Sequence, residues 1–187
     1  MLEKSLLLSE RLSRILVWTG GVLIIGSALM VTVEVALRKL VNVSIGGADE
    51  LSGYAFGVAT TLGFSFALFE RAHIRVDALF PFFPKWLRTF CNFLGLVLLV
   101  GFAAVVTTMA WSLVADTLNH GSRSITPLRT PLAIPQIPWL FGWLFFVFCG
   151  VLLGLVALMR LIRGDAAGAN LLIGVKSVEE QIEDEAV

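Results

Sequence analysis

The residues that could do chemistry in this chain are few, and they form no recognisable catalytic pattern. The sequence holds two histidines, His73 and His120, and two cysteines, Cys91 and Cys149. Both histidines lie outside the apolar runs, whereas a haem held inside a helix bundle needs histidines that face one another within it. No Ser–His–Asp or Cys–His arrangement and no phosphate-binding glycine loop stands out. We therefore predict no catalytic residue, no substrate-binding residue, no metal site and no cofactor, and we expect the chain not to be an enzyme.

The other polar groups of interest stand at the ends of apolar runs. Glu34 closes the first run and precedes Arg38 by four residues, which is the favourable order for an ion pair on a helix. An unpaired carboxylate at the margin of a membrane segment is costly, so we interpret Glu34 as a paired acid at the interface. Asp49 and Glu50 open the second run, where the positive end of the helix dipole favours acids. The second run ends in a charged cluster made of Glu70, Arg71, His73, Arg75 and Asp77.

The composition indicates a membrane protein. Of the 187 residues, 57% are hydrophobic and 15% are charged, and the mean hydropathy is +0.88, whereas a soluble domain has about 25% charged residues. A membrane helix needs roughly 20 apolar residues. We predict an all-α integral membrane protein with four transmembrane helices at about residues 15–37, 50–69, 90–114 and 139–159. A net charge of zero gives no indication of nucleic-acid binding, and both cysteines lie in apolar runs as small buried hydrophobes.

Shorter segments flank the four helices. Residues 1–14 mix charges with leucines and predict an amphipathic lead-in at the membrane surface. Aromatic and cationic residues between positions 78 and 88 predict a second interfacial segment, and four prolines between positions 116 and 138 predict an extended loop. Residues 15–163 would then form the membrane domain, and residues 164–187 an acidic cytoplasmic tail that is partly disordered.

The distribution of basic residues predicts the orientation. With four crossings both termini lie on one side, and that side would carry ten basic residues: Lys4, Arg11, Arg14, Arg71, Arg75, Lys85, Arg88, Arg160, Arg163 and Lys176. The opposite side would carry four, namely Arg38, Lys39, Arg123 and Arg129. Because basic residues are enriched on the cytoplasmic side of membrane proteins, we predict that both termini are cytoplasmic.

One face of the second helix is lined by small residues. Its members recur every four positions: Gly53, Gly57, Thr61 and Ser65. Such a face gains little from lipid but allows another helix to approach closely, so it predicts a helix contact within the chain or with a partner. The alternative is that small residues are simply common in membrane helices. The fourth helix holds a second GxxxG pair, Gly150 and Gly154. We regard residues 46–77 as the stretch around which the chain is organised.

Several short motifs, taken in order, resemble a known family. An acid-x-x-x-aromatic pattern at Glu50 and Tyr54 opens the second helix. The sequence after that helix is Ala72-His73-Ile74-Arg75-Val76-Asp77, and Ile134-Pro135 precedes Trp139 at the fourth helix. With four crossings in a short chain, residues 10–163 resemble the small membrane subunit, of DctQ type, of tripartite ATP-independent periplasmic (TRAP) transporters. The family often has a tryptophan just before the acid, where this chain has Gly46-Gly47-Ala48.

The resemblance implies a division of labour among three proteins. A periplasmic substrate-binding protein captures an organic acid, a large membrane subunit carries it inward with sodium, and the small subunit is a scaffold for the large one in the inner membrane of a bacterium or archaeon. It implies no catalytic residue, and only Glu50, His73, Val76 and Asp77 are carried over, as architecture at helix ends. An accessory four-helix subunit of another membrane complex remains the alternative.

Overall fold

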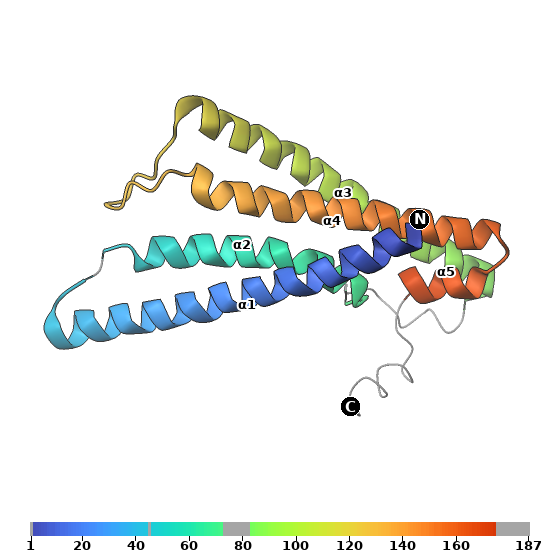
Figure 1. The fold of residues 1–187 in the computed structure, drawn as a ribbon, viewed down its shortest axis with the longest axis horizontal. Helices are drawn as coiled ribbons and strands as arrows, with labels where there is room; N and C mark the ends of the chain where they lie inside the picture. The colour runs from blue at the N-terminus through green and yellow to red at the C-terminus, as the bar shows by residue number, and fades with distance from the viewer. Residues whose placement is uncertain (1, 45, 73–82, 175–187) are drawn as a thin grey trace.

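The computed structural model describes residues 2–44, 46–72 and 83–174, and the elements within these ranges are helices (Figure 1). Four of them are long and apolar enough to cross a membrane. This confirms the all-helical fold class with four membrane-spanning helices. The helices are α1 (Leu2–Val41), α2 (Ala48–Phe69), α3 (Lys85–His120), α4 (Ala133–Ile162) and α5 (Ala166–Ile173).

The first helix is much longer than the sequence predicted. α1 has 40 residues, which at a rise of 1.5 Å per residue is about 60 Å, twice the hydrocarbon thickness of a bilayer. The structure shows no break near residue 15, so residues 2–14 of the predicted lead-in are continuous with the rest of α1. The physical reason is that leucine, lysine, glutamate and arginine are all good helix formers, and no glycine or proline interrupts them.

The prolines near the fourth helix also lie differently from the prediction. Pro135 and Pro138 fall in the first two turns of α4, so the loop between α3 and α4 is residues 121–132 rather than 116–138. The first N–H groups of a helix have no partner within it, and Pro135 in the first turn therefore costs little, whereas Pro138 lies inside the helix. Two further predicted segments change as well. α3 already begins at Lys85 within the proposed interfacial segment, and residues 166–173 of the proposed tail form α5.

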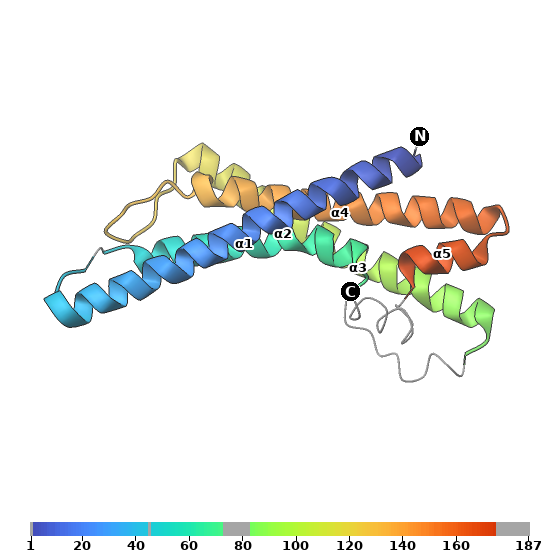
Figure 2. The same cartoon turned by 60° about the horizontal axis from the view of Figure 1, so that its bottom comes forward.

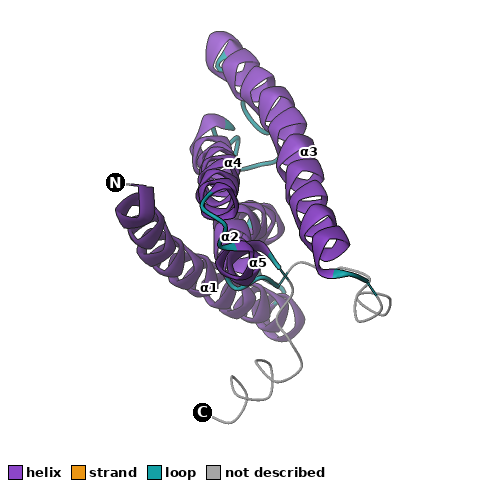
Figure 3. Cartoon of the chain, turned by 90° about the vertical axis from the view of Figure 1, so that its right-hand side faces the viewer, coloured by secondary structure: helices purple, strands orange, loops and turns teal. Residues whose placement is uncertain are grey.

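The four long helices pack in a row and not in a closed bundle. The order across the row is α1, α2, α4, α3, as Figures 1 and 3 show. α5 turns back from the end of α4 and packs against both α4 and α3 (Figure 2). Apart from α5, no helix of the described chain covers either broad side of the row.

The core is centred on α4. Its buried apolar side chains include Phe146, Leu153 and Val156, and they pack against residues of α2 and α3 such as Leu68 and Leu96. In the most apolar part of each helix, 44% of residues are buried in α4 but only 6% in α1. α1 therefore directs most of its apolar surface outward, toward lipid or a partner protein.

Candidate functional site

At one end of the row, a buried carboxylate joins α1 to the segment that follows it. Glu34 is 2% exposed. Its Oε1 accepts a hydrogen bond of 2.7 Å from Arg38 Nη2, one turn later, and one of 2.6 Å from the hydroxyl of Ser44. Asn42 lies between them with a φ of 52°, a backbone conformation that asparagine tolerates better than most residues. Glu34 thus fixes the position of the segment that follows α1.

A second carboxylate at the same end joins α2 to the loop between α3 and α4. Glu50 Oε1 accepts a hydrogen bond of 2.7 Å from the hydroxyl of Tyr54, one turn along α2. The other oxygen, Oε2, accepts a hydrogen bond from the hydroxyl of Thr126. Thr126 lies 2.6 Å from the Ser124 hydroxyl, which in turn accepts from the backbone N–H of Thr130 at 3.2 Å. One carboxylate therefore ties the loop to the start of α2.

The loop itself is a narrow turn that presents these hydroxyls. Ser124 N donates to Thr130 O at 2.9 Å, and Arg129, with a φ of 47°, donates from its N–H to Thr126 O at 3.0 Å. Leu128 packs so closely against Gly47 that a Cβ there would collide with it. This contact explains why a glycine fits just before α2. The sequence analysis singled out Glu50 and Tyr54 but missed Thr126 and Leu128. The signal available for Thr126 was the group of hydroxyl residues around Pro127.

The small-residue face of α2 divides into two halves. Thr61 and Ser65 are buried, and Thr61 lies against Gly142 of α4, where a side chain would collide with it. Around Gly53 and Gly57 no atom lies within 4 Å of where a Cβ would stand. One half of the face is thus a helix contact within the chain. The other half lines an open hollow of about 170 Å³ between α2 and the start of α4.

The remaining close helix contacts use other glycines. Gly150 of α4 faces Val100 of α3 at a distance that leaves no room for a side chain, while a Cβ at Gly154 would lie 3.4 Å from Leu96. α1 approaches α2 at Gly20, where a Cβ would lie 3.1 Å from the carbonyl oxygen of Ala59. The sequence analysis did not point to Gly20, which belongs to no regular small-residue spacing. It also missed Gly142, which is in four-residue register with Gly150 but is separated from it by Phe146.

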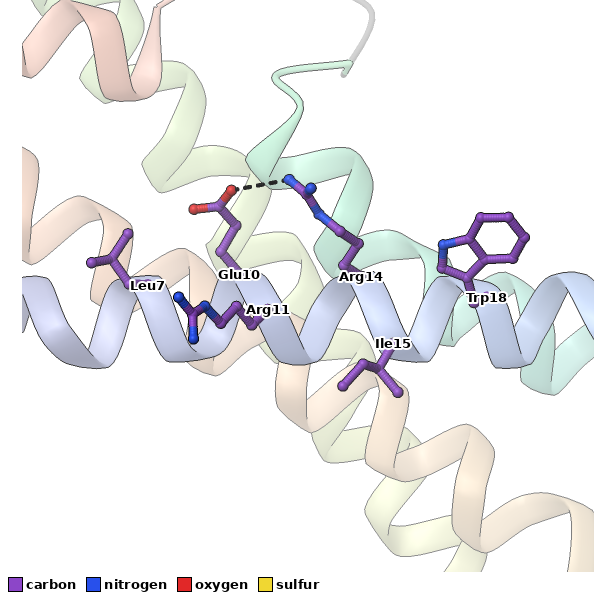
Figure 4. Close-up of a pocket in the computed structure, with 6 residues that line it drawn as sticks. All are labelled: Leu7, Glu10, Arg11, Arg14, Ile15 and Trp18. Carbon is purple, nitrogen blue, oxygen red and sulfur yellow. Dashed lines mark hydrogen bonds and ion pairs between the residues drawn. The ribbon is translucent and has the colours of Figure 1, made fainter.

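The N-terminal half of α1 carries a shallow hollow of about 540 Å³ on its own surface. Figure 4 shows its lining side chains, all from one helix: Leu7, Glu10, Arg11, Arg14, Ile15 and Trp18. Glu10 and Arg14 form an exposed ion pair of 3.4 Å, and Trp18 is 74% exposed. Arginine and tryptophan side by side suit the boundary between lipid and water.

Among the residues that the structure describes, these polar groups form no catalytic arrangement. Within the described ranges, no three His, Cys, Asp or Glu side chains come together as a metal site would require. His120 lies 3.1 Å from Asp116 one turn earlier, and both side chains are about 70% exposed. His73, Arg75, Val76 and Asp77, which the sequence singled out, lie outside the described residues. The polar clusters that can be described fasten helix ends to loops.

The fold is that of a small multi-pass membrane protein whose polar groups connect helix ends to loops by hydrogen bonds. The family of TRAP transporter DctQ components matches residues 27–166, which is well over half of the chain. The chain belongs to this family of small TRAP transporter membrane subunits. No curated protein and no solved structure matches it.

Proposed function

We propose that this chain is the scaffold subunit of a sodium-coupled TRAP transporter that imports an organic acid, with both termini in the cytoplasm of a bacterial or archaeal cell. On this proposal the large membrane subunit carries the substrate and the sodium, and a periplasmic substrate-binding protein delivers the substrate. The observation that carries the proposal is the family match over residues 27–166 together with the open row of four helices.

The chemistry of the membrane interior supports a scaffold role. The apolar parts of the four helices, residues 15–33, 51–69, 89–115 and 133–159, contain no Asp, Glu, Lys, Arg or His. Ion-coupled carriers place polar groups and broken helices at the middle of the membrane. The polar clusters at Glu34 and Glu50 instead lie at helix ends and are occupied in holding loops.

The shape of the row supports a membrane partner. α1 and α3 flank the row, and residues such as Trp18, Val22 and Phe102 along them are more than 60% exposed. A closed four-helix bundle buries one side of every helix in a shared core, whereas a row offers a long face on which a larger protein can pack. The same geometry fits the alternative, an accessory subunit of another membrane complex.

Reconstitution into vesicles tests the proposal. With the large subunit, the binding protein and a sodium gradient present, uptake of the organic acid should require this chain, and the chain alone should move none. Sodium-driven uptake by the purified chain above that of empty vesicles would refute the scaffold role. Copurification with a membrane complex unrelated to a TRAP large subunit would establish the alternative.

A further inference from the structure

The hollow on the N-terminal half of α1 faces away from the rest of the row. Leu7, Arg11 and Trp18 of its lining share one face of the helix, because they are four and seven positions apart (Figure 4). Arg11 and Trp18 are about 10.5 Å apart along the helix axis. The buried residues of this half of α1 lie on the opposite face, toward α2 and α4: Leu6, Ser9, Ser13 and Gly20. The hollow is therefore open to whatever surrounds the protein.

The hollow lies at the depth of the lipid headgroups. Residues 15–33 of α1 are uncharged and extend about 28 Å, close to the roughly 30 Å of the hydrocarbon core. Arg11 lies four residues before Ile15, which is about 6 Å outside the core for a helix along the bilayer normal. The headgroup layer is roughly 5–8 Å thick on each side. Arg11 is therefore level with lipid phosphates, and Trp18 lies about one turn inside the core.

The Arg11 side chain is available to a ligand. Within the described ranges, its guanidinium is exposed and forms no hydrogen bond or ion pair. The neighbouring acids already have basic partners: Glu10 pairs with Arg14 at 3.4 Å, and Glu3 pairs with Arg160 at 3.4 Å. Figure 4 shows Arg11 apart from the Glu10–Arg14 pair. Because a guanidinium carries five N–H donors, Arg11 can bind an oxyanion without breaking a contact of the fold.

The charges around the hollow favour an anion. Its lining holds Arg11, Arg14 and Glu10, which gives a net charge of +1. At the same end of the row the described chain has six further basic and three further acidic residues: Lys4, Arg71, Lys85, Arg88, Arg160, Arg163, Glu3, Glu70 and Asp165. None of these acids lines the hollow, so their balance adds to its positive charge. The ammonium of a zwitterionic headgroup would meet only Glu10, which Arg14 already neutralises.

We propose that this hollow binds an anionic phospholipid. Arg11 donates charge-assisted hydrogen bonds to the phosphate, and the indole of Trp18 lies beside the glycerol backbone, where its N–H can donate to an ester carbonyl. The acyl chains continue along Val22 and Ile25, which are exposed on the same face. A lipid matches this face along its whole length, from a cation at phosphate level through a boundary tryptophan to an apolar stretch. The proposal goes beyond the transporter role and does not depend on it.

Native mass spectrometry of the full chain, released from detergent with added lipids, tests this site. The probes are phosphatidylglycerol and phosphatidylethanolamine with identical acyl chains, and soluble glycerol phosphate is the competitor. We expect the anionic lipid to be retained about fivefold more strongly, the effect of one basic side chain beside an anionic headgroup. Equal retention of both lipids would overturn the proposal. Full displacement of phosphatidylglycerol by glycerol phosphate would also overturn it, because the hollow would then be a site for a free phosphate compound.

Two arginines at the same end separate a site from general attraction. Arg11→Gln should lower retention of phosphatidylglycerol about fivefold. Arg163→Gln removes the same charge at the end of α4, outside the hollow, and should leave retention unchanged. Both side chains are exposed, so both variants should keep the melting temperature of the unmodified chain. Equal losses of lipid for the two variants would show general electrostatic attraction and refute the site.

Trp18→Ala tests the apolar part of the hollow. It leaves every charge in place and should lower retention of both lipids, since both have a glycerol backbone that meets the indole. Recovery of the large membrane subunit with a tagged chain separates a lipid face from a protein contact. If Arg11→Gln and Trp18→Ala lower that recovery and leave lipid retention unchanged, this face of α1 is a protein contact and the proposal is overturned.

Discussion

Thr126, in the loop between α3 and α4, donates a hydrogen bond to Glu50 in the first turn of α2, a residue 76 positions earlier in the sequence. This bond connects the helix pair α1–α2 with the pair α3–α4 at one end of the row. At the other end Asn170 connects α5 to α3. The row of helices is thus held by apolar contacts along its length and by polar bonds at both ends.

The bond between Thr126 and Glu50 predicts a loss of stability when the hydroxyl is removed. A hydrogen bond to a charged group is stronger than one between neutral groups, although the partial exposure of this cluster weakens its contribution. Thr126→Val should therefore lower the melting temperature of the chain in mild detergent. Because the two residues share one interaction, Thr126→Val combined with Glu50→Gln should cost less than the sum of the single changes.

Thr60→Val is the matched control for Thr126→Val. The Thr60 hydroxyl bonds only within its own helix, to Phe56 O at 2.8 Å, so its loss should leave the melting temperature nearly unchanged. A fully additive double variant would show that Glu50 and Thr126 do not act through a common bond.

Two ion pairs on α1 differ in burial, and this predicts different costs when each is broken. Arg38 pairs with Glu34, which is 2% exposed, whereas Arg14 pairs with Glu10 on the exposed surface. Removing Arg38 leaves a buried carboxylate with fewer partners, so Arg38→Ala should lower the melting temperature of the chain by more than Arg14→Ala does. Arg14→Ala should cost less than about 0.5 kcal/mol. Equal melting temperatures for the two variants would contradict this interpretation of Glu34.

The basic residues predict the orientation of the chain, which accessibility labelling can measure. In a background without Cys91 and Cys149, a cysteine at Ser122 should react with a membrane-impermeant reagent added to the periplasm. A cysteine at Lys4 should react only after the cytoplasm is opened. The reason is the ten-to-four excess of basic residues on the side of the termini. Labelling of the Ser122 position from the cytoplasm alone would reverse the predicted topology.

The sequence predicted the number of membrane helices because apolar run length is a direct measure of what can span a bilayer. Helix ends were harder to predict. The charged residues 2–14 continue α1 because helix formers do not stop at the edge of an apolar run, and Pro135 enters α4 because the first turn needs no N–H donors. The hydroxyl residues around Pro127 gave no indication that Thr126 bonds to Glu50, since a contact 76 positions away leaves no periodic trace.

The sequence analysis also placed the centre of packing on a different helix from the structure. The small-residue spacing of α2 drew attention to residues 46–77, but the largest buried cluster lies on α4, between α2 and α3. Spacing shows which residues share a face, and it does not show which neighbour fills that face. Gly142 is the example: the sequence analysis did not single it out, yet it lies directly against Thr61.

The two halves of the small-residue face of α2 predict opposite effects of a leucine on stability. Gly142 of α4 contacts one half, and Gly57 lies in the other half. Gly142 of α4 has no room for a side chain because Thr61 lies against it. Gly142→Leu should therefore destabilise the chain itself, by about 1–3 kcal/mol as overpacking does, and lower its melting temperature. At Gly57, no atom of the described chain lies within 4 Å of the position that a Cβ would take. Gly57→Leu should leave the melting temperature nearly unchanged.

If a partner helix packs on the open half of the face, Gly57→Leu should weaken recovery of the large subunit with a tagged chain in mild detergent, because leucine holds two helix backbones apart. Phe56→Leu, on the outward side of α2 where Phe56 is 64% exposed, is the matched control and should recover the large subunit normally. Leucine is favoured in lipid, so neither change should prevent insertion. Unchanged recovery and unchanged melting for Gly57→Leu would mean that Gly53 and Gly57 face lipid and that their spacing reflects membrane composition alone.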